Sequence, residues 1–154
     1  HAFRPELGNN AISDAAKIIV AIQAIMDNES KAFKGFSLPK DDDFEYGSFC
    51  VLKVDGGYKT YSVVVPEMCE IVLNRLIVPG ETKETVLEDF QKLINSLELD
   101  SKVNLEIVPP FYYSYKIHQD HQLNQLLLES YQEIFNKKPK SSYLKMITDA
   151  NTTM

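Results

Sequence analysis

Histidine can both bind metal and transfer protons near neutral pH, and the chain has three histidines: His1, His118 and His121. Two histidines three residues apart share a face when both belong to one helix, and such a pair can ligate a metal ion. His118 precedes the helix that we expect from about His121, and the sequence nearby fixes no third ligand. The pair is therefore open to two interpretations. It is either a metal site or a pair of solvent-facing residues at the start of a helix, and we favour the second.

The other motifs that carry chemistry are missing. The sequence has no His-Glu-x-x-His, phosphate loop, dinucleotide glycine motif, nucleophile elbow or Cys-x-x-Cys pair. Its two cysteines, Cys50 and Cys69, are too few for a disulfide framework and lack the spacing of metal ligands. We interpret them as small strand residues and assign no metal ligand and no bound cofactor to this chain.

Composition places the chain among soluble globular proteins and excludes two classes of partner. It has 154 residues, 44% hydrophobic and 25% charged, enough for one domain or one domain with part of another. A net charge of −6 without a basic stripe argues against nucleic acid, and no apolar run is long enough for a membrane span. We expect a cytoplasmic protein. Because few intact proteins begin with histidine, we also expect sequence upstream of His1 to be missing.

The secondary structure expected from periodicity and turn signals alternates between helices and strands. Asn9 and Asn10 can cap a first helix, and Thr82 can cap a second. The full set of expected elements is a helix to about residue 27, strands 48–54 and 69–78, a helix after Thr82, a strand 103–108, a helix over about 121–136 and a strand 143–147. The order helix, strand, strand, helix, strand is an α+β pattern.

Each expected helix carries an apolar stripe at helical spacing. The second helix has the cleanest stripe, and we expect all three stripes to face a core. Their members are Ile12, Ala15, Ile18, Ile19, Ile22, Ile25 and Met26 in the first, Val86, Leu87, Phe90, Leu93, Ile94 and Leu97 in the second, and Leu123, Leu127, Tyr131, Ile134 and Phe135 in the third.

Two blocks of sequence resemble one family. Residues 73–85 (LNRLIVPGETKET) join an apolar strand to a Pro-Gly-Glu-Thr turn that opens a helix, and residues 1–12 run His-Ala-Phe-Arg-Pro-Glu-Leu-Gly-Asn-Asn-Ala-Ile. Together they resemble the lid, or dimerisation, domain of zinc metallopeptidases of the acetylornithine deacetylase and succinyl-diaminopimelate desuccinylase type. In that family the lid does not hold the zinc.

The resemblance implies a fold and a division of the chain. It implies a ferredoxin-like lid, an antiparallel sheet with two helices on one face, over residues 1–110. Residues 111–154 would then be a helix-strand piece of the α/β catalytic domain, where the chain returns to it. The family's lid has a further strand before the position of His1, so we expect another segment or another chain to fill that place. The resemblance also implies that the protein is a homodimer.

Four residues receive a role from the resemblance. His1 would reach the partner subunit's active site and donate a hydrogen bond to the scissile carbonyl as it becomes an oxyanion. Arg75 stands near the family's arginines before Pro-Gly-Glu, and it either clamps a substrate carboxylate or forms a surface ion pair. Ser62 lies where an Asn often binds substrate, and Asp149 matches the Asp of a Gly-Thr-Asp-Ala segment near the substrate pocket.

Two classes of function remain open. In the first, the chain is part of a zinc-dependent amidohydrolase or peptidase that cleaves the amide bond of a small N-acyl amino acid or short peptide. The family's metal ligands and general base would then lie outside this chain, so the fragment alone would be inactive. The alternative is a non-catalytic α+β dimerisation or interaction module. Metal content of the parent protein discriminates between the two.

Overall fold

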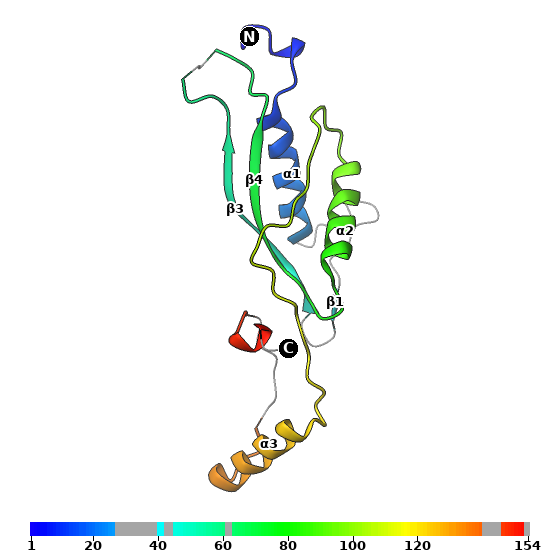
Figure 1. The fold of residues 1–154 in the computed structure, drawn as a ribbon, viewed down its shortest axis with the longest axis vertical. Coiled ribbons are helices and arrows are strands. Elements are labelled where there is room, and N and C mark those ends of the chain that lie inside the picture. Colours follow the sequence, from blue (N-terminus) through cyan, green and yellow to red (C-terminus); the bar gives the residue numbers. More distant parts are fainter. Residues whose placement is uncertain (27–39, 42–44, 61–62, 140–145, 153–154) are drawn as a thin grey trace.

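The computed structural model describes residues 1–26, 40–41, 45–60, 63–139 and 146–152. Figure 1 shows an elongated molecule in which a hairpin and two helices form the upper part, and a third helix stands apart below. The elements in chain order are η1 (Pro5–Leu7), α1 (Ala11–Met26), β1 (Lys40–Asp41), β2 (Glu45–Tyr46), β3 (Ser48–Gly56), β4 (Cys69–Leu76), α2 (Lys83–Asn95), α3 (Gln122–Phe135) and η3 (Asp149–Thr152).

Helix α1 begins and buries one face as its sequence predicts. The Asn10 side-chain oxygen accepts hydrogen bonds from the backbone N–H groups of Ile12 (3.0 Å) and Ser13 (3.3 Å), which caps the first turn. The buried residues are Ala11, Asp14, Ala15, Ile18, Ala21, Ile22 and Ile25. The spacing of three and four residues puts them on one stripe, so α1 turns a continuous surface toward the sheet.

Strands β3 and β4 form an antiparallel hairpin whose two faces differ in polarity. The register runs from Ser48 opposite Leu76 to Gly56 opposite Cys69, with an irregularity between Val51 and Lys53. The irregularity shifts the alternation of β3 by one residue, so Val51 and Val54 stand opposite Leu73 and Ile71 on the same face. The residues of the hairpin that pack on the helices are Phe49, Ile71 and Leu73, whereas Cys50, Lys53, Asp55, Glu70 and Asn74 are exposed.

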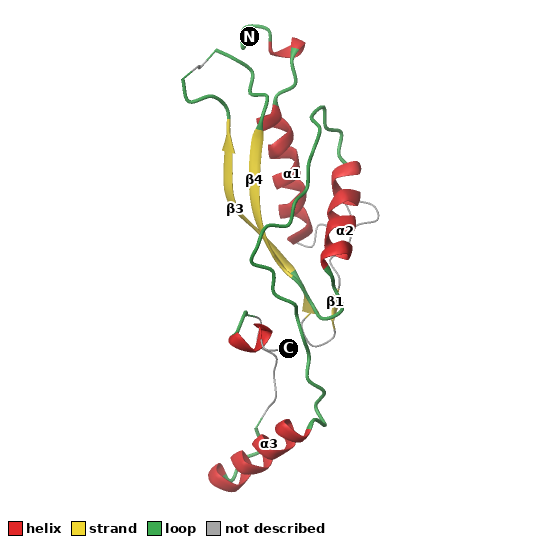
Figure 2. Cartoon of the chain, in the orientation of Figure 1, coloured by secondary structure: helices red, strands yellow, loops and turns green. Residues whose placement is uncertain are grey.

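Helix α2 completes the core. The Thr82 side chain accepts from the Thr85 backbone N–H, and the Thr85 hydroxyl accepts from Thr82 N–H, a reciprocal cap that starts the helix as predicted. Its buried residues are Phe90, Leu93 and Ile94. They form one cluster with α1, and Figure 2 shows both helices over the same face of the hairpin. The expected α+β lid architecture is therefore confirmed.

The prediction of a strand at residues 103–108 is wrong. This segment is extended, and its residues alternate between half-buried and exposed, yet it belongs to no strand. Within the described residues, β4 pairs only with β3, and residues 103–108 have no ladder partner. A strand is defined by its hydrogen-bonded neighbour, so a segment with the right side-chain pattern remains unassigned when that neighbour is missing.

Helix α3 forms where the periodicity predicts it, but its apolar stripe does not face a core. None of its residues is buried, and Leu123, Leu127, Tyr131, Ile134 and Phe135 are all exposed. The expectation that these side chains point inward is thus corrected, because no described element packs against them. The strand expected at 143–147 lies mostly outside the described residues. None of the helices in the described ranges combines the length and apolarity needed to cross a bilayer.

Candidate functional site

His1 is exposed at one end of the molecule and is held there by backbone contacts. The Ala2 N–H donates to the carbonyl of Val63 at 2.8 Å, which ties the start of the chain to the segment before β4. The His1 Nδ1 accepts from the Phe3 N–H at 3.2 Å. Because Nδ1 acts as the acceptor, the neutral ring carries its proton on Nε2. That N–H is a donor suited to an oxygen atom that gains negative charge.

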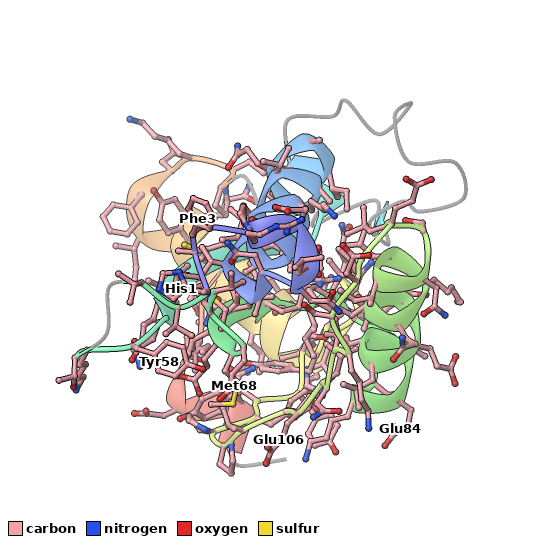
Figure 3. The ribbon with its side chains drawn as sticks, turned by 90° about the horizontal axis from the view of Figure 1, so that it is seen from above. His1, Phe3, Tyr58, Met68, Glu84 and Glu106 are labelled. Atoms are coloured by element: carbon pink, nitrogen blue, oxygen red, sulfur yellow. The ribbon has the colours of Figure 1, made fainter. Side chains whose placement is uncertain are left out.

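Exposed apolar side chains share this end of the molecule with His1. Phe3 and Met68 are 84% and 79% exposed, and Tyr58 is also exposed. Figure 3 looks onto this end of the molecule, and Figure 1 places the N-terminus above the upper ends of β3 and β4. An exposed apolar surface with a single imidazole can contact another protein or an apolar part of a substrate.

Arg75 lies in a buried ion pair. Its guanidinium bonds to the Glu81 carboxylate and to the carbonyl of Leu76, and it stands over the Phe49 ring at 4.9 Å from the ring centre. The second Glu81 oxygen accepts from the Val78 N–H at 2.6 Å. One carboxylate therefore joins the end of β4 to the Pro-Gly turn that leads into α2.

Burial limits what Arg75 can do. The side chains of Arg75 and Glu81 are only 11% and 7% exposed. Burial lowers the pKa of the guanidinium, against the charges of Glu81 and Asp89, which raise it. Of the two roles left open for Arg75, the ion pair is the one observed here, although it is buried rather than at the surface. A substrate carboxylate would have to compete with Glu81.

Two candidates for substrate binding remain, Ser62 and Asp149. Ser62 lies outside the described residues. Asp149 is exposed and begins η3, a turn in which Asn151 accepts from the Thr148 N–H at 2.9 Å and donates to the Tyr113 carbonyl at 2.8 Å.

The predicted site residues do not converge. His1 lies near the start of β4, whereas Arg75 lies near its end, and Figure 1 places η3 beyond the lower end of the hairpin. Among the described residues, the chain therefore offers one exposed catalytic candidate and no complete site. His1, Arg75 and Asp149 lie apart because they belong to three separate parts of the chain.

His118 and His121 accept backbone hydrogen bonds at the start of α3. His121 is the N-cap, and its Nδ1 accepts from the Leu123 N–H at 3.2 Å. His118 Nδ1 accepts from the Asp120 N–H at 3.3 Å. This confirms the interpretation as helix-start residues. In the described ranges, no three His, Cys, Asp or Glu side chains gather where they could hold a metal ion.

Sequence reasoning missed Asp14, a buried carboxylate that clamps α1 to the loop after α2. Asp14 is 4% exposed, and one oxygen accepts from the backbone N–H groups of Asp100 (3.0 Å) and Ser101 (2.8 Å). The other oxygen accepts from Lys17 at 2.9 Å, and Lys17 also donates to the Glu98 carbonyl at 2.7 Å. The sequence does contain a signal for this role, because Asp14 is the one acidic residue within the apolar stripe of α1.

The environment of Asp14 favours its charged form. Burial alone would raise its pKa, but the hydrogen bonds from Lys17 and Ser101 and the Lys17 charge lower it, and the net shift is downward from 3.8. A buried carboxylate remains charged only when it is paired and hydrogen-bonded in this way. Asp14 is therefore a structural residue.

Two helices cover one face of the hairpin, and an exposed histidine stands at the start of the chain. This arrangement is that of a lid-like α+β domain. The family described as "Peptidase dimerisation domain" matches residues 1–102 of the 154. The chain belongs to this family. Searches among curated proteins and among solved structures find no match.

Proposed function

We propose that this chain is the lid of a zinc-dependent amidohydrolase or peptidase that cleaves the amide bond of a small N-acyl amino acid or short peptide. The observation that carries the proposal is the family match over residues 1–102, which makes the chain part of a peptidase. The finer type, resembling acetylornithine deacetylase and succinyl-diaminopimelate desuccinylase, rests on the two sequence blocks described above. We propose the cytoplasm as its location, in keeping with two free cysteines.

In this proposal the zinc belongs to the longer enzyme. The described residues of this chain do not fit a zinc site, so no step is assigned to a metal held by them. When bound in the catalytic domain, zinc would activate the attacking water. The contribution of this chain would be to supply one hydrogen-bond donor and to cover the substrate.

His1 is the residue that we propose for that donor. Its ring is exposed, and its Nδ1 is occupied by the Phe3 N–H, so Nε2 is left to donate. A donor placed at the substrate carbonyl strengthens its hydrogen bond as the oxygen becomes negative, and this selectively stabilises the transition state.

Replacement of His1 in the full-length parent enzyme tests this function. His1→Ala should lower kcat by about 10²–10³-fold, as does the loss of one oxyanion donor, while zinc content and thermal stability change little. Leu7→Ala, at a residue of η1 that is 74% exposed and has no assigned role, is the control for local disturbance. An unchanged kcat would exclude the catalytic role. A parent without zinc or amidase activity that still associates would point to the non-catalytic interaction module.

A further inference from the structure

The segment before α1 is fastened at both ends to residues 57–68, which connect β3 to β4. The Ala2 N–H donates to the Val63 carbonyl at 2.8 Å, and the Ala11 N–H donates to the Pro66 carbonyl at 3.0 Å. Each bond joins two parts of the chain that are far apart in the sequence. The side chains on either side of the first bond therefore come from both segments and lie close to one another.

A tight turn places Phe3 next to His1. The Arg4 N–H donates to the His1 carbonyl at 3.0 Å, which closes a four-residue turn. Inside this turn the Phe3 N–H donates to the His1 Nδ1 at 3.2 Å. The imidazole is therefore held against the backbone of Phe3, and the free nitrogen of the ring, Nε2, lies on its other side.

Two apolar side chains flank this turn and are exposed. Phe3 follows Ala2 directly and is 84% exposed, and Val63, which accepts the bond from Ala2, is 46% exposed. An apolar group that covers these side chains removes them from water and is bound more tightly for that reason.

The charges near the turn balance each other. Arg4 pairs with Glu6 at 2.8 Å. The sequence of residues 57–68 contains one cation, Lys59, and one anion, Glu67, and both are exposed. This end of the chain therefore has no excess of one sign that would select a charged ligand. Lys59 nevertheless defines the competing chemistry, because a cation there could attract a carboxylate.

We propose that Phe3 and Val63 form a specificity subsite for an apolar group next to the scissile amide. The inference rests on the proposed function, in which the His1 Nε2 donates to the scissile carbonyl oxygen. The groups bonded to the carbonyl carbon and to the amide nitrogen are the parts of the substrate nearest to that oxygen. Side chains that flank His1 contact one of these groups, so the substrate is an N-acyl amino acid with an alkyl or aryl group on one side of the amide.

Two substrate series on the full-length parent enzyme test the subsite and distinguish the two sides of the amide. The acyl series is N-acetyl-, N-butyryl- and N-hexanoyl-alanine, and the amine series is the N-acetyl derivatives of alanine, norvaline and norleucine. In one series kcat/KM should rise about two- to fourfold for each added methylene. The responding series identifies the side that occupies the subsite. Flat dependence in both series would overturn the proposal.

Variants assign this dependence to the two side chains. Phe3→Ser and Val63→Ser should each lower kcat/KM for the longest substrate about five- to tenfold and for the shortest less than about twofold. Phe3→Leu should retain most of the dependence on chain length. Leu7→Ser, at the 74% exposed residue of η1, is the matched control and should leave it unchanged. An unaltered dependence in both serine variants would overturn the assignment.

A pair of substrates of equal length tests apolar against charged recognition. In the acyl series the pair is N-butyryl- and N-succinyl-alanine, and in the amine series it is N-acetyl-norvaline and N-acetyl-glutamate. The apolar member should have the higher kcat/KM by at least about tenfold, because burial of a carboxylate against apolar side chains is costly. Preference for the acidic member, lost in Lys59→Gln, would overturn the proposal and assign recognition to Lys59.

His1→Ala separates this subsite from the proposed function. It should lower kcat by about the same factor for every member of the responding series and leave the dependence on chain length intact. If His1→Ala lowers kcat while Phe3→Ser and Val63→Ser leave that dependence unchanged, the subsite alone is wrong. If His1→Ala has no effect, or no N-acyl amino acid is cleaved, the proposed function fails and the subsite with it.

Discussion

The Glu81 carboxylate contacts the Arg75 guanidinium with one oxygen and the Val78 N–H with the other. The Pro-Gly turn that carries it is part of the sequence block that resembles the family, so that block has a structural role. Gly47 lies beside the pair, and a Cβ there would come within 2.5 Å of the Leu76 carbonyl and would also meet the Arg75 side chain. The end of the hairpin is therefore built around this pair.

Glu81→Ala should destabilise the chain strongly. It leaves the Arg75 charge buried without a partner and the Val78 N–H unsatisfied, and breaking one side of a buried pair costs about 3–5 kcal/mol. Urea unfolding followed by circular dichroism measures this loss. Glu84→Ala, in the exposed first turn of the same helix, should change the unfolding free energy little. A similar small effect of Glu81→Ala would contradict the structural role.

Asp14 makes stability depend on pH. Its pKa in the folded chain lies below the ordinary value of 3.8, so its contribution is present above that pH and is lost as the pH falls through the folded pKa. The difference in unfolding free energy between the chain and its Asp14→Asn variant should be largest near about pH 6 and should shrink below 3.8. The exposed Asp120→Asn serves as control, and a difference that stays constant with pH would count against the clamp.

Helices α2 and α3 show that the formation of a helix and its burial against a core have different causes. Both begin at a capping residue, Thr82 and His121, and both have an apolar stripe. The stripe of α2 is buried against α1, whereas α3 buries no residue. Capping and periodicity are local and fix where a helix starts, but burial requires a second element at the right place.

Removal of residues 111–154 should leave the lid folded. Every residue of the core cluster and of the side chains packed on it lies before residue 110, and contacts that would be lost, such as Lys83 over Phe111, lie outside the cluster. A chain that ends at residue 110 should unfold at nearly the same urea midpoint, within about 0.5 kcal/mol. A loss of several kcal/mol, or an unfolded product, would show that the predicted boundary between 1–110 and 111–154 is wrong.

For the whole molecule, the family name and the open edge of β3 support association into a homodimer, which remains a proposal. In the described part of the chain, β3 pairs only with β4, and Leu52 and Val54 on it are 62% and 48% exposed. Exposed edges with apolar side chains can extend a sheet across a two-fold axis.

Leu52→Lys should shift the proposed dimer toward monomer. A charge at a strand edge opposes pairing with an identical edge, since two copies of the lysine would approach each other. Light scattering over a range of protein concentration gives the mass. Leu126→Lys, at a residue of α3 with 51% exposure, controls for a general effect of added charge. A monomer mass for the unchanged chain at high concentration would exclude the homodimer.

Local sequence was sufficient for the three α-helices, the β3–β4 hairpin and the family. Asn10 and Thr82 mark helix starts, the apolar stripes give the faces of α1 and α2, and the two blocks at residues 1–12 and 73–85 agree with the family match. These features depend on neighbours within a few residues, which a linear pattern records directly.

Tertiary structure alone decided which groups meet. It paired Arg75 with Glu81 and bonded Asp14 to the backbone N–H of Ser101. Within the part of the chain that the structure describes, it left residues 103–108 extended without a strand partner. It also left the apolar stripe of α3 exposed. Each outcome depends on whether a distant segment occupies the adjacent space, and side-chain periodicity carries no information about that neighbour.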